Sequence, residues 1–125
     1  MKISKAIISY YLADVTLAWF NNNDLPPKDI FQYHHCIMQM QLGAISHGDL
    51  NELRLAFEYL LANPQINCEE FAGDRYPYDD KEVREIIHYA WQTIWPDAQP
   101  IPPGGPVDVE LINTSLDDWW AQRKY

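Results

Sequence analysis

Basic residues are scarce in this sequence. Nine Lys and Arg residues stand against 18 Asp and Glu residues, which gives the 125-residue chain a formal net charge of −9. Sequence-independent binding of DNA or RNA depends on Lys and Arg side chains that meet phosphates. Peripheral binding to an anionic membrane depends on the same charges. The composition therefore argues against both kinds of partner and favours a basic protein.

Cysteine is scarce as well, since the chain has only Cys36 and Cys68. Small secreted domains that depend on disulfides carry more cysteines than this, at regular spacings. We expect two reduced and mostly buried thiols, with a single disulfide between them as the alternative.

A long, clean apolar run is missing. The chain starts with Lys2 and Lys5 and then turns apolar, as a signal peptide would, but Asp14 interrupts the run. No small-x-small cleavage pattern follows before Trp19. The run is also shorter than the roughly 20 apolar residues of a membrane span. The sequence predicts a cytoplasmic protein, and its 47% hydrophobic content predicts one folded domain over residues 1–125.

Catalytic motifs are missing too. There is no G-x-S-x-G sequence, and the paired glycines Gly104–Gly105 lie among prolines instead of at the start of a helix that could hold a phosphate. His34 and His35 are adjacent, and neither has a metal-ligand type of residue three or four positions away. A metal site that gathers His35, Cys68 and His88 from separate helices is the alternative. The sequence predicts a protein that is not an enzyme and holds no metal or cofactor.

Apolar residues recur at helical spacing over most of the chain. Asp49 with Glu52, and Asp79 with Glu82, each resemble the capping box that starts a helix. For the first segment, a strand is the alternative because Ile-Ile-Ser-Tyr-Tyr has β character. The fold class is predicted as all-α, a single-domain bundle of four main helices with a short C-terminal helix. The predicted helices cover residues 4–20, 28–45, 49–62, 79–95 and 115–123.

A proline-rich segment follows the fourth predicted helix. Five prolines within residues 96–106 exclude a helix or strand interior and predict an extended arm. After it, residues 107–111 alternate as a short strand would, but no partner strand is evident in the sequence.

Acidic and aromatic residues are interleaved between residues 69 and 85. This stretch has seven acids against three bases, and another five acids without a base follow in residues 97–118. Carboxylates steer a basic partner, and aromatic side chains supply contact area. The alternative is a solvated acidic surface with the tyrosines packed underneath. The predicted partner-binding residues here are Glu69, Glu70, Asp74, Tyr76, Tyr78, Asp79, Asp80, Glu82 and Glu85.

Two adjacent tryptophans, Trp119 and Trp120, lie on the last predicted helix. Adjacent helical residues cannot share one face, so one tryptophan is expected at a boundary. They either dock the terminal helix on the domain or serve as an exposed anchor for a partner or a second subunit.

The profile as a whole resembles that of bacterial immunity proteins, antitoxins and phage-encoded inhibitors, which are short, acidic and without catalytic motifs. This likeness implies a module that binds and neutralises a basic toxin or nucleic-acid enzyme, as a monomer or small homo-oligomer. The alternative is a phage or secretion-system assembly adaptor that acts through oligomer contacts.

Overall fold

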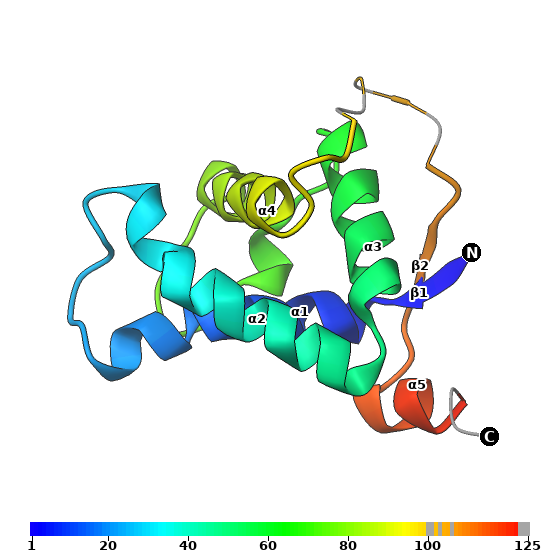
Figure 1. Ribbon diagram of the computed structural model, residues 1–125, viewed down its shortest axis with the longest axis horizontal. Helices are drawn as coiled ribbons and strands as arrows, with labels where there is room; N and C mark the ends of the chain where they lie inside the picture. Colours follow the sequence, from blue (N-terminus) through cyan, green and yellow to red (C-terminus); the bar gives the residue numbers. More distant parts are fainter. Residues whose placement is uncertain (100–101, 103, 106, 123–125) are drawn as a thin grey trace.

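The computed structural model describes residues 1–99, 102, 104–105 and 107–122, and it is mostly helical (Figure 1). Three short 3-10 turns and one two-stranded sheet accompany the helices. The α-helices are α1 (Lys5–Thr16), α2 (His34–His47), α3 (Leu50–Ala62), α4 (Asp80–Ile94) and α5 (Leu116–Gln122). The 3-10 turns are η1 (Ala18–Asn21), η2 (Ile30–Tyr33) and η3 (Glu69–Phe71), and the strands are β1 (Lys2–Ser4) and β2 (Glu110–Ile112).

Helix α1 is the central element, because it packs against α2, α3 and η3. Its N-cap is Ser4, whose hydroxyl oxygen accepts a hydrogen bond from the Ala6 backbone N–H at 3.1 Å. Its apolar residues lie nearly all round the helix, so six of its twelve residues are buried. The helix is shorter than the predicted 4–20, since it ends at Thr16 and the 3-10 turn η1 follows.

The turn between α2 and α3 is built on Gly48, which has a φ of 74° and closes α2 by donating to the carbonyls of Ala44 and Ile45. The predicted capping box at α3 is wrong, because the Asp49 side chain makes no capping hydrogen bond and is buried instead. The corresponding prediction for α4 is confirmed. Asp79 accepts from the Glu82 backbone N–H at 2.8 Å, and Glu82 accepts from that of Asp79 at 3.1 Å.

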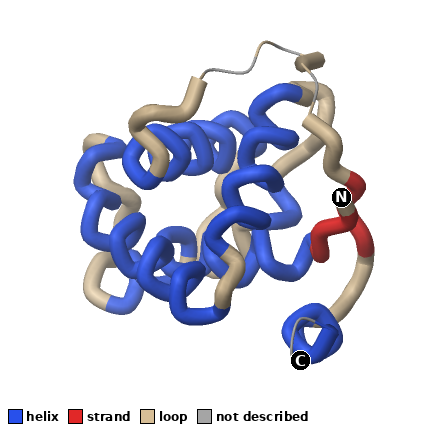
Figure 2. Tube along the Cα trace, turned by 45° about the vertical axis from the view of Figure 1, so that its right-hand side comes forward, coloured by secondary structure: helices blue, strands red, loops and turns tan. Residues whose placement is uncertain are grey.

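Strands β1 and β2, which are far apart in the sequence, form a parallel ladder (Figure 2), in which Ile3 pairs with Leu111. Strand β1 is therefore the partner strand that the sequence did not reveal for the strand predicted in residues 107–111. The Ser4 hydroxyl donates to the Thr114 carbonyl, so the N-cap of α1 also belongs to this junction.

The predicted proline-rich arm falls partly outside the described residues, which omit 100–101, 103 and 106. Within it, the backbone N–H of Gly104 donates to the carbonyl of Ala62 at the end of α3. This bond ties the segment between α4 and β2 to the body of the protein.

Candidate functional site

The acidic segment from η3 to the first turns of α4 contains carboxylates that face solvent. Glu69, Glu70, Asp74, Asp79 and Glu85 are all exposed. Glu70 lies 4.0 Å from the ammonium of Lys5, a weak ion pair. Over the described part of the chain, no basic group lies within 4 Å of the other four carboxylates. We call Glu69, Asp74 and Glu85 the acidic rim, because their carboxylates make neither an ion pair nor a cap.

Asp80 has a different role from its acidic neighbours. Its carboxylate accepts from the Cys68 backbone N–H at 2.7 Å and from Arg84 Nε at 3.1 Å. Arg84 in turn donates to the carbonyls of Leu60, Asn63 and Ile66. The pair therefore joins the start of α4 to the end of α3 and the loop that follows. Asp80 therefore stabilises the packing of α4 against the loop after α3, which makes it a poor candidate for a partner contact.

The environment of Asp80 also changes the ionisation of nearby groups. The Cys68 N–H and the Arg84 guanidinium hold the pKa of the Asp80 carboxyl below its ordinary value. Burial raises the pKa of the Cys68 thiol to about 11, which makes it a poor nucleophile.

The tyrosines of the acidic segment pack inward. Tyr78 is only 7% exposed, and its hydroxyl lies 2.8 Å from the hydroxyl of Tyr33. Tyr76 is half-buried and stacks on Phe20 at 5.3 Å with the rings 11° apart. Burial raises the pKa of both Tyr33 and Tyr78, so neither phenol ionises near neutral pH. Of the two interpretations of the tyrosines, packing underneath the acidic residues is the one that Tyr78 follows, because its ring lies in the core.

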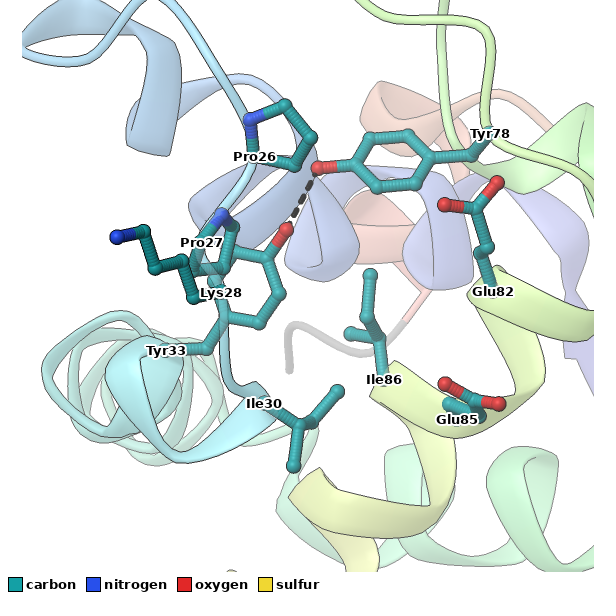
Figure 3. A pocket seen from close by; sticks show the side chains of 9 residues that line it. All are labelled: Pro26, Pro27, Lys28, Ile30, Tyr33, Tyr78, Glu82, Glu85 and Ile86. Atoms are coloured by element: carbon teal, nitrogen blue, oxygen red, sulfur yellow. Dashed lines mark hydrogen bonds between the residues drawn. The ribbon is translucent and has the colours of Figure 1, made fainter.

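A cavity of about 170 Å³ lies beside Glu85 of the acidic rim, between the loop before η2 and the first turns of α4 (Figure 3). Glu82 and Glu85 line the α4 side, and the Tyr33–Tyr78 pair lies at one end. Lys28 lines the opposite side, and its ammonium points away from the two carboxylates. The remaining walls are apolar, from Pro26, Pro27, Ile30 and Ile86.

Carboxylates beside apolar and aromatic walls suit one kind of side chain. Lys and Arg have long aliphatic stems that pack on apolar surface and a charged head that seeks a carboxylate. In this cavity Glu82 already accepts from the Asp79 backbone, while Glu85 is exposed. The cavity can therefore receive a basic side chain, with Glu85 as the main charged contact.

The two tryptophans of α5 lie at a separate place, against the α2–α3 corner. Trp119 is 6% exposed, and its indole N–H donates to the carboxylate of Asp49 at 3.1 Å. The indole of Trp120 donates to the same carboxylate at 2.8 Å and stacks on His47 at 4.3 Å. The exposed-anchor interpretation fails for Trp119, since these contacts dock α5 on the domain. The sequence does not indicate Asp49 as a partner of the tryptophans, because its position before α3 indicates an N-cap.

A second cavity, of about 390 Å³, has Asp14, His35 and Cys36 among its lining residues. These residue types invite a catalytic interpretation. Burial and the nearby Asp14 raise the pKa of the Cys36 thiol, whereas a nucleophilic cysteine needs a lowered one. Burial raises the pKa of Asp14 too.

Metal-ligand residues are not gathered in the structure. In residues 1–99, 102, 104–105 and 107–122, no three His, Cys, Asp or Glu side chains are placed to hold a metal ion. The structure therefore does not bring His35, Cys68 and His88 together as a site. Both cysteines are free, with Cys68 buried and Cys36 half-buried.

Comparison with protein-family models, with curated proteins and with solved structures finds no match for this chain. Among the helices that the structure describes, none combines the length and the apolar character that crossing a membrane requires.

Proposed function

We propose that this protein is a binding module that captures a basic protein partner and neutralises it, in the manner of an immunity protein or antitoxin. The observation that carries the proposal is the acidic rim, whose exposed carboxylates have no basic group within 4 Å in the described residues. Unpaired carboxylates raise the rate of encounter with a basic surface, because attraction acts before contact.

The cavity beside the rim supports the same proposal. A basic surface that approaches the rim presents Lys or Arg side chains, and Glu82 and Glu85 offer one of them a partly enclosed place. Binding there replaces water around Glu85 with a charge-assisted hydrogen bond. Burial raises the pKa of the cavity's two tyrosines, Tyr33 and Tyr78, which favours binding over catalysis as the use of the cavity.

The test compares two variants of equal net charge. In the rim variant, Glu69, Asp74 and Glu85 are each changed to Lys. In the control, the exposed residues Asp24, Asp97 and Asp117 are changed to Lys, so that the overall charge is the same and only its place differs. Asp79 and Asp80 are left intact, because they cap α4 and hold Arg84.

The wild-type chain is immobilised, and a basic protein is captured from a lysate of the native cell at low salt. The on-rate of the purified partner is then measured for each variant, together with binding of an oligoarginine peptide by calorimetry. We expect the rim variant to lose about tenfold or more in on-rate, and the control to lose much less. Equal on-rates for wild type and rim variant would show that the partner binds elsewhere.

A further inference from the structure

Helix α2 and the turns that flank it carry no formal charge. Residues 30–48 contain no Asp, Glu, Lys or Arg, in a chain with 22% charged residues. A solvated helix face normally carries such side chains, since they keep it in water. This stretch is therefore an exception to the acidic character of the rest of the molecule.

The outer face of α2 combines two exposed apolar side chains with uncharged polar ones. Leu42 is 60% exposed and Ile45 is 55% exposed. Met38, which precedes them by about one turn of α2, is half-buried. Next to the helix, Phe31 is 67% exposed and meets the ring of Tyr89 edge-on at 5.5 Å. The opposite face of α2, with Ile37, Met40 and Ala44, is buried in the core.

The spacing on this outer face is that of a helix that pairs with another helix. His35, Met38, Leu42 and Ile45 follow one another at intervals of three, four and three residues, which are the a and d positions of a heptad. The flanking e and g positions are His34, Gln39, Gln41 and Ser46, and none of them is Asp, Glu, Lys or Arg. Charges at e and g normally select a partner of opposite charge, and here that selection is missing.

We infer that the α2 face, defined as His35, Met38, Leu42 and Ile45, binds the α2 face of a second copy of this chain. Two copies with a net charge of −9 repel each other through their acidic surfaces, and this repulsion is smallest where the facing residues carry no charge. A basic partner has no carboxylate to meet on this face and is drawn to the acidic rim instead. The α2 face is thus better suited to a second copy than to a basic protein, and the test of this inference does not require the proposed partner.

Salt separates the two kinds of binding. Self-association through the α2 face should strengthen as salt is raised, because salt screens the repulsion between the two acidic molecules. Binding of a basic protein at the rim should weaken under the same change. Because the α2 face as defined has only four residues, we expect the dimer to dissociate on dilution.

The experiment is sedimentation equilibrium with light scattering over a wide range of concentrations, at low and at high salt. The wild type should show a monomer–dimer equilibrium that shifts toward dimer at high salt. Leu42→Glu should be monomeric throughout, since it places two carboxylates face to face. Leu25→Glu is the control, because Leu25 is 74% exposed and is not part of the α2 face, and it should dimerise as the wild type does.

A mixing experiment adds a readout that misfolding would not produce. Leu42→Lys should be monomeric alone, but an equimolar mixture with Leu42→Glu should form heterodimers. Circular dichroism of each variant establishes that it is folded. A wild type that stays monomeric at all concentrations and salts, or a Leu42→Glu variant that dimerises like the wild type, overturns the inference.

Discussion

The indole nitrogen of Trp120 donates a hydrogen bond of 2.8 Å to the carboxylate of Asp49, 71 residues earlier in the chain. The same buried carboxylate accepts from the Tyr11 hydroxyl at 2.5 Å and from the indole of Trp119 at 3.1 Å. Burying a carboxylate is costly unless donors replace its water. Asp49 therefore links α1, α3 and α5, and the docking of the last helix depends on it.

The first prediction concerns Asp49→Asn. The amide keeps one acceptor oxygen but turns an N–H₂ group toward side chains that are themselves donors. We expect the free energy of unfolding to fall by about 3 kcal/mol, measured by urea denaturation. Asp117→Asn, at an exposed position of α5, is the control and should change stability by less than about 0.5 kcal/mol. Equal denaturation midpoints for Asp49→Asn and the wild type would contradict this role of Asp49.

The second prediction is a double-mutant cycle of Tyr11→Phe and Trp120→Phe. Each change removes one donor to Asp49 while keeping an aromatic ring, so each should cost about 1 kcal/mol. Because both donors bind the same carboxylate oxygen, the two effects should differ from additivity by about 0.5 kcal/mol or more. Strict additivity would mean that the two hydrogen bonds act independently. The cycle is measured by thermal and urea unfolding of all four proteins.

The third prediction uses the lowered pKa of Asp80. A carboxyl whose pKa is lower in the folded state stabilises that state above its unfolded pKa, about 3.9, and this stability is lost as the pH falls through the folded pKa. At pH 7, Asp80→Asn should be less stable than the wild type by about 1–2 kcal/mol. Below about pH 4 the difference should shrink, because protonated Asp80 resembles asparagine. A difference that stays constant from pH 7 to pH 2 would contradict this assignment.

The fourth prediction concerns the thiols. With a pKa of about 11, Cys68 is almost entirely protonated at pH 8, and it is also buried. A thiol reagent should therefore label the half-buried Cys36 slowly and Cys68 only when the protein unfolds. Mass spectrometry of the wild type and Cys36→Ser, with and without urea, distinguishes the two sites. Fast labelling of Cys36→Ser without urea would contradict the burial of Cys68.

Local signals were enough to predict much of the helical structure. Asp79 and Glu82 start α4, and Pro64 and Pro96 follow the ends of α3 and α4, because these residues act on the backbone within a few positions. The sheet was not predictable in this way. Its strands have three residues each and lie at opposite ends of the chain, so no local pattern indicates that Ile3 pairs with Leu111.

In the candidate site, the exposure of the carboxylates could be predicted from the sequence, whereas the burial of the aromatic side chains could not. The exposed carboxylates of Glu69, Asp74 and Glu85 follow from the solvation of charge. Whether Tyr78 faces solvent depends on Tyr33, 45 residues earlier, whose hydroxyl is its hydrogen-bond partner. Asp80 likewise depends on distant residues, since Arg84 reaches the carbonyls of another helix and loop.

The pairing of β1 with β2 sets an order for the events of biosynthesis. Residues 2–4 are synthesised about 5–20 s before their partners at 110–112 at the usual rates of translation. Throughout that interval the first strand has an unpaired edge, and α1 lacks the carbonyl of Thr114 that binds its N-cap serine. The sheet can therefore close only after residues 110–114 have been made, and until then the edge of β1 is open to pairing with other polypeptides.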